Sequence, residues 1–134
     1  LGGILGTGPY KDRRDEILEY WKTQMTDIAS CGNVFLKLGG IGMPMMGFRW
    51  DKRDRPASSL ELAEAWTDPI QYAIEVFGAD RCMFESNFPV DKRGVGYVPL
   101  WNSFKLIAAG CSAEEKRDLF HNTAARAYRL PLLT

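Results

Sequence analysis

The chain has 134 residues, of which 46% are hydrophobic and 25% are charged, a composition typical of one globular domain. Basic and acidic residues number 17 each, so the formal net charge is zero. This balance excludes the basic surface of a nucleic-acid-binding protein, and no apolar run approaches the roughly 20 residues that span a bilayer. We therefore expect neither nucleic acid nor a membrane as a partner. Three widely spaced cysteines and no visible signal peptide favour a cytoplasmic location.

Apolar residues recur at helical spacing in several stretches of the chain. This periodicity predicts five helices, over residues 12–30, from a cap at Ser58 or Ser59 to residue 77, and over residues 98–109, 113–120 and 123–128. We expect Asp12 to cap the start of the first helix and Gly32 to end it in a left-handed conformation. Pro69 is expected to kink or split the second helix, because proline lacks the backbone N–H. Asn122 is expected to cap the last one.

Two short apolar runs, residues 34–38 and 81–85, are predicted strands bounded by turn residues. The first is apolar on both faces apart from Lys37, which is typical of strands in a parallel sheet. Strands that alternate with helices favour parallel βαβ units. Because an isolated pair of strands is marginally stable in water, the sequence predicts an α/β piece of a larger barrel or doubly wound sheet.

The second predicted strand carries the most specific motif in the chain. Residues 81–91 read Arg-Cys-Met-Phe-Glu-Ser-Asn-Phe-Pro-Val-Asp. This string resembles the last-strand signature of the amidohydrolase-2 family, whose usual form is Ser-Asp-Trp-Pro. Residues 33–40 resemble the penultimate strand of that family, and residues 120–130 resemble its closing helix. The resemblance implies that residues 1–134 form one C-terminal segment of a (β/α)8 TIM barrel, with its last strands and helices.

The resemblance also implies a function. Family members are hydrolases, so the complete barrel is expected to act on a lactone or a related cyclic ester or amide, a small-molecule substrate. Barrel enzymes gather their functional groups at the C-terminal ends of the strands. We therefore expect Asn87 and Glu85 to be catalytic, and Lys37, Arg49 and Asp91 to bind substrate.

One position departs from the family pattern. The aspartate of the family's last strand, a metal ligand or general base, aligns with Asn87. A neutral amide cannot accept a proton as a carboxylate does, although it can orient a water or bind a substrate carbonyl. The family's metal-binding histidines lie upstream, and this chain has only His121. We therefore expect no metal site and little activity in this chain alone, and zinc as a candidate cofactor of the full-length enzyme.

Each candidate residue also has a structural interpretation that the sequence leaves open. Lys37 and Glu85 can pair with each other across the two strands, because a charge inside an apolar strand needs a partner. Asp91 can cap a loop and Asn87 can be a turn residue. Arg49 belongs to a basic, methionine-rich loop, residues 39–57, which either lines a substrate pocket or folds onto its own core.

A non-catalytic alternative also remains open. A partial barrel exposes the edges of its sheet, and exposed edges pair readily with another copy of the chain. Zero net charge leaves little repulsion against this association. The chain would then be a self-associating α/β module, and a homo-oligomer is expected in either case.

Overall fold

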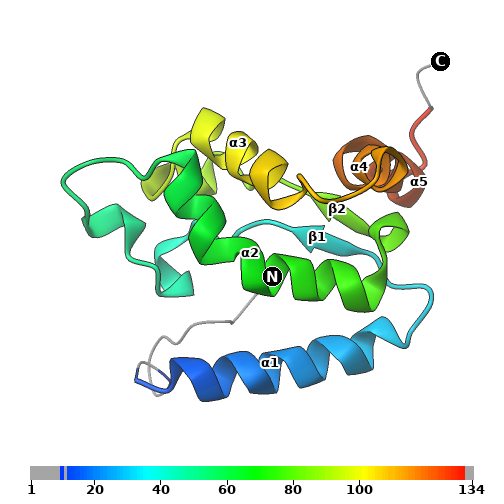
Figure 1. Ribbon diagram of the computed structural model, residues 1–134, viewed down its shortest axis with the longest axis horizontal. Coiled ribbons are helices and arrows are strands. Elements are labelled where there is room, and N and C mark those ends of the chain that lie inside the picture. Colours follow the sequence, from blue (N-terminus) through cyan, green and yellow to red (C-terminus); the bar gives the residue numbers. More distant parts are fainter. Residues whose placement is uncertain (1–9, 11, 132–134) are drawn as a thin grey trace.

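The computed structural model describes Tyr10 and residues 12–131, and its architecture is α/β (Figure 1). Strands β1 (Leu36–Leu38) and β2 (Cys82–Phe84) form a parallel pair in which Leu36 lies opposite Cys82 and Leu38 lies opposite Phe84. The predicted parallel pairing is confirmed. Each strand is shorter than its apolar run, because only three residues on each side take part in the ladder.

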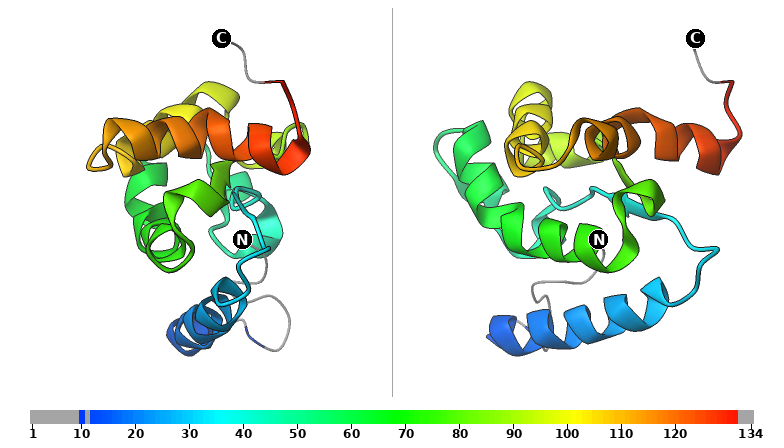
Figure 2. Two further views of the ribbon diagram at one scale, coloured as in Figure 1. Left: turned by 90° about the vertical axis from the view of Figure 1, so that its right-hand side faces the viewer. Right: turned by 45° about the vertical axis from the view of Figure 1, so that its right-hand side comes forward.

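Five α-helices surround this pair in the described part of the chain: α1 (Arg14–Ala29), α2 (Ser59–Phe77), α3 (Tyr97–Ile107), α4 (Ala113–Arg117) and α5 (Thr123–Tyr128). Helix α2 lies between the strands in sequence and provides the crossover that parallel strands require. It packs against α1 and α3. Figure 2 shows α1 on one side of the strands and α4 and α5 on the other. None of the described helices is long and apolar enough to cross a membrane.

Helix α2 begins with a capping box and contains a proline. The Ser58 side chain accepts from the backbone N–H of Glu61, and the Glu61 carboxylate accepts from the backbone N–H of Ser58. These bonds satisfy helix N–H groups that have no partner within the helix. Pro69 lies inside the helix, which is continuous and visibly bent (Figure 1). The prediction of a kink is therefore confirmed, and the helix is not split.

Three expected helix caps are wrong. Helix α1 begins after Arg13 rather than Asp12, and no side chain caps it. It ends at Ser30 in a right-handed conformation, whose N–H bonds back to helix carbonyls, so no left-handed residue is needed at Gly32. Asn122 caps nothing because Asp118–Asn122 form a π-helical turn that joins α4 directly to α5. A chain that stays helical has no free N–H groups to cap.

Side chains alternate between the two faces of the strands, and one face carries the core. Leu38 and Cys82 are fully buried, and the Phe84 ring stacks on Phe104 of α3 with 4.6 Å between ring centroids. The other face carries Lys37, and Phe35, just before the strand, is 42% exposed. This second face is only partly covered, because Met83 opposite Lys37 is buried while Lys37 and Phe35 are accessible.

The loop 39–57 folds largely onto the core of its own chain. Ile41 and Met46 are buried, and the rings of Phe48 and Trp50 stack at 5.8 Å. Trp50 also meets Trp66 of α2 edge to face, at 6.4 Å. Of the two interpretations of this loop, the structural one therefore accounts for most of its apolar residues.

Candidate active site

Lys37 and Glu85 are brought together at the C-terminal ends of the two strands. Lys37 Nζ lies 2.7 Å from Glu85 Oε2, and the side chains are 49% and 24% exposed. The hydrogen bond and the charge of Glu85 raise the pKa of Lys37 above its ordinary value. The Lys37 ammonium therefore stays protonated at neutral pH and can act as a cation, not as a base.

The backbone just after β1 lies close to Glu85 beside this ion pair. A Cβ atom added at Gly39 would lie 2.2 Å from Glu85 Cγ and 2.4 Å from the Glu85 carbonyl oxygen. No real Cβ atom tolerates such distances. The glycine therefore allows the end of β1 to lie against Glu85, which holds that carboxylate next to Lys37.

Asn87 follows β2 in a left-handed conformation, with φ of 52°. Asparagine tolerates this conformation better than most residues. Its Nδ2 donates to Asp91 Oδ1 at 2.7 Å, and a Cβ atom added at Gly40 would lie 3.5 Å from the same nitrogen. Asn87 therefore lies where the two strand-end loops meet, as both its functional and its turn interpretation require.

Asp91 is fully buried between the same two loops. Its Oδ2 accepts from the backbone N–H of Gly42 at 3.1 Å, while Oδ1 accepts from Asn87. Burial raises the pKa of this carboxyl, and the two hydrogen bonds partly oppose that rise. Asp91 thus ties the loop after β1 to the loop after β2, in keeping with its structural interpretation. Its expected contact with substrate stays a prediction.

Arg49, the fifth predicted site residue, is exposed and has a left-handed φ of 57°. Its guanidinium makes no ion pair with any described residue. The structure therefore leaves its side chain accessible, and its role in substrate binding remains a prediction.

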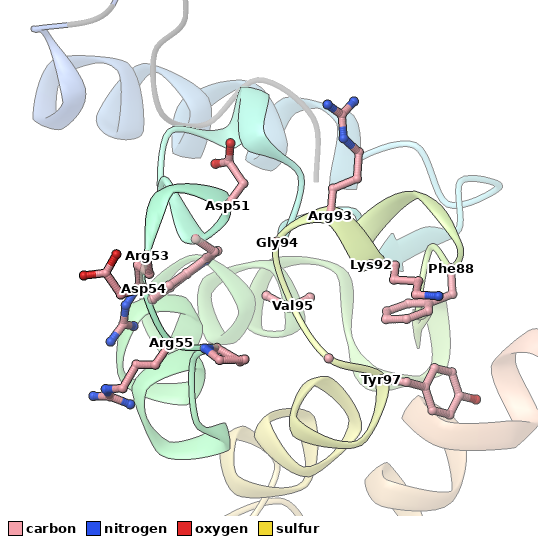
Figure 3. A pocket seen from close by; sticks show the side chains of 13 residues that line it. Asp51, Arg53, Asp54, Arg55, Phe88, Lys92, Arg93, Gly94, Val95 and Tyr97 are labelled. Atoms are coloured by element: carbon pink, nitrogen blue, oxygen red, sulfur yellow. The ribbon is translucent and has the colours of Figure 1, made fainter.

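An open hollow of about 610 Å³ lies between the loops that follow the two strands (Figure 3). Asp51 and residues 53–55 line one side, and Phe88, Lys92 and Tyr97 line the other. None of the five predicted site residues lines this hollow, although Asn87 adjoins Phe88 in the chain. The candidate catalytic side chains thus lie at the strand ends, and the hollow lies between the loops that follow these strands.

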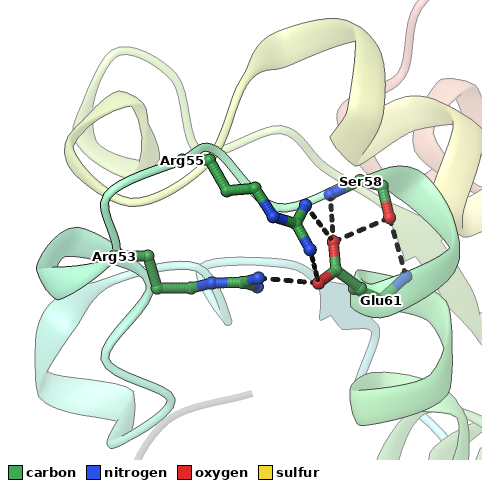
Figure 4. Close-up of polar contacts among 4 residues, drawn as sticks. All are labelled: Arg53, Arg55, Ser58 and Glu61. Carbon is green, nitrogen blue, oxygen red and sulfur yellow. Dashed lines mark hydrogen bonds and ion pairs between the residues drawn. The ribbon is translucent and has the colours of Figure 1, made fainter.

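Two arginines of the basic loop are paired with Glu61 of α2 (Figure 4). Arg53 Nη2 lies 2.6 Å and Arg55 Nη2 2.9 Å from Glu61 Oε1. The hydrogen bond from Arg53, reinforced by Ser58 and Arg55, holds the pKa of Glu61 well below its ordinary range. These arginines thus anchor the loop to α2 and offer less positive charge to a ligand than the sequence suggests.

Among residues 10 and 12–131, no group of three or more histidine, cysteine, aspartate or glutamate side chains is placed to hold a metal ion. His121 Nδ1 lies 2.9 Å from Asn122 Oδ1, away from the strand-end residues in the sequence and on the π-helical turn. The expected absence of a metal site in the whole chain stays a prediction.

Comparison with known proteins identifies the family. A sequence model described as amidohydrolase matches residues 5–130, almost the whole chain. The chain belongs to the amidohydrolase family. The resemblance carried by the second strand is thereby confirmed.

This amidohydrolase segment is similar to longer proteins. It is 38% identical over 112 residues to the uncharacterised protein y4mH of Sinorhizobium fredii, covering 84% of this chain and 33% of that protein. It is 32% identical over 126 residues to an L-fucono-1,5-lactonase of Burkholderia multivorans, covering 90% of this chain and 38% of the lactonase. The segment thus spans little more than a third of the length of these relatives.

Solved structures agree with this assignment. A crystal structure of an amidohydrolase from Burkholderia multivorans with bound HEPES matches at a TM-score of 0.77 and 27% identity, covering 91% of this chain and 40% of that one. A structure of an amidohydrolase from the same organism with bound zinc matches at a TM-score of 0.75 and 27% identity, covering 87% and 39%. The arrangement of this amidohydrolase segment is therefore one that experimental structures of the family contain.

The sequence prediction missed the glycines that build the site. Gly39, Gly40 and Gly42 face Glu85, Asn87 and Asp91 in that order, one glycine for each polar residue. The available signal was the string Leu-Gly-Gly-Ile-Gly directly at the end of β1, because glycine permits close backbone approach. The residues that pack against these glycines are distant in the sequence, so the string alone does not identify them.

Proposed function

We propose that this chain supplies the last two strands of a (β/α)8 barrel hydrolase, and that the complete site acts on a lactone or a related cyclic ester or amide. The observation that carries the proposal is the juxtaposition of Lys37 and Glu85, 2.7 Å apart, at the C-terminal ends of two parallel strands. Barrel enzymes build their sites at this end. Similarity to a protein named as an L-fucono-1,5-lactonase supports the substrate class.

The reaction that fits these groups is acyl transfer to water. Water adds to the carbonyl carbon, a carboxylate takes its proton, and the bond from that carbon to the ring oxygen breaks to release a hydroxy acid. The Lys37 ammonium suits the negative charge that develops on the carbonyl oxygen, because its raised pKa keeps it protonated. Glu85 is the accessible carboxylate beside it, and Asn87 supplies a neutral polar group nearby.

Asp91 and Arg49 are assigned different parts in this proposal. Asp91 is fully buried, so it acts through Asn87 and Gly42 rather than by reaching the substrate from its present position. Arg49 is exposed on the loop after β1 and is proposed to attract an anionic group of the substrate or product. Its removal should therefore affect binding more than the chemical step.

Zinc is a proposed cofactor of the complete enzyme, as one similar structure contains it. The donor atoms described here do not fit a zinc site. Asn87 is a neutral amide whose nitrogen faces Asp91, and both Asp91 oxygens accept hydrogen bonds. Zinc would need ligands from outside the described residues, and no step above depends on a metal ion.

A lactone panel tests the proposal. The complete protein is purified and assayed with L-fucono-1,5-lactone, D-glucono-1,5-lactone and δ-valerolactone, with and without a chelator. Hydrolysis is measured as the release of acid. The proposal expects hydrolysis of at least one lactone above the spontaneous rate, and loss of that activity with chelator if zinc takes part. No hydrolysis of any lactone by the complete protein, with zinc supplied, would contradict it.

A further inference from the structure

We propose that Asp91 is a positioning residue that fixes the side-chain amide of Asn87, so that Asn87 offers its carbonyl oxygen to an O–H donor at the strand-end site. The donor is a water molecule or a hydroxyl of the substrate. This inference rests on the proposed function for its location in an active site. The orientation of Asn87 itself rests only on hydrogen bonding.

The partners of Asp91 determine which end of the amide faces it. Gly42 contributes a backbone N–H, which can only donate, and it lies 3.1 Å from Asp91 Oδ2. An ionised carboxylate has no proton to give, so its second oxygen must also accept. The Asn87 amide meets that oxygen with Nδ2 at 2.7 Å. One of its two NH2 hydrogens is therefore committed to Asp91, and the nitrogen end of the amide faces that carboxylate.

The backbone around Asn87 is held by the same turn. The N–H groups of Val90 and Asp91 both donate to the Asn87 carbonyl oxygen, at 2.9 and 3.2 Å. The Asp91 carbonyl in turn accepts from the N–H groups of Gly94 and Val95. Main chain and side chain of Asn87 are thus both fixed through Asp91, which leaves the amide little freedom to rotate.

The acceptor atom of the amide is Oδ1, which accepts no hydrogen bond from any described residue. An amide oxygen only accepts, so its natural partner is an O–H or N–H donor. This assignment separates Asn87 from Lys37. Lys37 is the cation that suits a developing oxyanion, and Asn87 offers an acceptor oxygen to an O–H donor.

A reciprocal exchange tests the orientation. In Asn87→Asp a carboxylate replaces the amide beside Asp91, and two acceptors face each other. In Asp91→Asn the new amide cannot accept from both Asn87 and Gly42. The double variant Asn87→Asp/Asp91→Asn restores both bonds, because the amide at 91 donates to the carboxylate at 87 and accepts from Gly42. It also keeps an acceptor oxygen at position 87, which a donor role for Asn87 would not tolerate.

We expect the thermal midpoint to fall in both single variants, most in Asn87→Asp, and to recover largely in the double variant. The surface change Asn33→Asp, at an exposed position, is the control. In NMR spectra of wild-type protein, the Asn87 side-chain NH2 should show one slowly exchanging proton, which Asp91→Asn perturbs. A double variant no more stable than Asn87→Asp, or rapid solvent exchange of both Asn87 protons, would overturn the orientation.

Kinetics on a lactone that the wild type hydrolyses identify the donor. Asp91→Asn should lower kcat about tenfold on every lactone if the donor is water, by loss of one hydrogen bond to a charged group. It should instead raise KM only for lactones with ring hydroxyls if the donor belongs to the substrate.

The kcat/KM of the double variant should stay within about tenfold of the wild-type value. If it loses all activity while keeping its stability, the acceptor role is wrong. If no lactone is hydrolysed by wild type, the proposed function fails, and the stability and NMR results still decide the orientation.

Discussion

Lys37 Nζ lies 2.7 Å from Glu85 Oε2, across two parallel strands that each end at this point. Lys37 lies opposite Met83, so Glu85 reaches it diagonally from the position just after β2, two residues beyond Met83. Glu85 can lie close to the end of β1 because Gly39 has no side chain. The pair is thus produced by strand register and one glycine, and it leaves both charges partly open to solvent.

The Lys37–Glu85 pair should contribute little to folding stability. Lys37→Met and Glu85→Gln should each change the free energy of unfolding by less than about 1 kcal/mol, because partly exposed ion pairs gain little over hydration. Urea unfolding monitored by tryptophan fluorescence measures this. A loss of several kcal/mol in either variant would show that the pair is mainly structural.

The close approach at Gly39 predicts a large effect of one methyl group. Gly39→Ala should destabilise the fold by at least the roughly 1–3 kcal/mol typical of overpacking, because the clash is with backbone as well as side chain. Gly32→Ala is the matched control, since nothing lies within 4 Å of a Cβ atom there. Equal urea midpoints for the two variants would mean that β1 and Glu85 are further apart than described.

The lowered pKa of Glu61 predicts how the stability of the fold depends on pH. Its pKa is lowered in the folded chain, so its contribution to stability is present above its ordinary pKa of 4.5 and is lost as the pH falls. Glu61→Gln should therefore lose less stability than wild type between about pH 6 and about pH 3. The thermal midpoint across this range measures the effect. Glu64→Gln, an exposed change on the same helix, should follow the wild-type curve, and a Glu61→Gln curve parallel to wild type would refute the prediction.

The partly exposed face of the described sheet predicts that the chain associates with itself. The described sheet has two strands only, and Phe35 next to β1 is 42% exposed. We expect the purified 134-residue chain to sediment as more than its 15.1 kDa monomer at micromolar concentration. Phe35→Lys should shift it toward monomer, whereas Tyr20→Lys on α1 should not. A monomeric wild-type chain in analytical ultracentrifugation would contradict this expectation.

Local sequence signals predicted the framework well. Ser58 and Ser112 each begin a helix with a capping box, whose glutamate stands three residues later in the sequence. The parallel pairing followed from the alternation of strands with helices along the chain. These features depend on neighbouring residues, so a single sequence contains the information that fixes them.

Long-range contacts set the limits of prediction. That Asp91 is buried and bonded to Gly42, 49 positions earlier, depends on how two loops meet. Asn122 has the residue type of a cap, yet tertiary packing keeps it helical through the π-turn, and the Thr123 hydroxyl instead bonds to Ala79, 44 positions away. The string from Glu85 to Asp91 indicated the site, but not which of its side chains face solvent and which hold the loops.

Whether the strand-end pair of Lys37 and Glu85 serves catalysis is decided by the lactonase activity of variants at these two positions. With a lactone that the complete protein hydrolyses, we predict that Lys37→Met and Glu85→Gln each lower kcat/KM at least about tenfold, while Lys105→Met on α3 matches wild type. Wild-type kcat/KM in both strand-end variants would contradict the account.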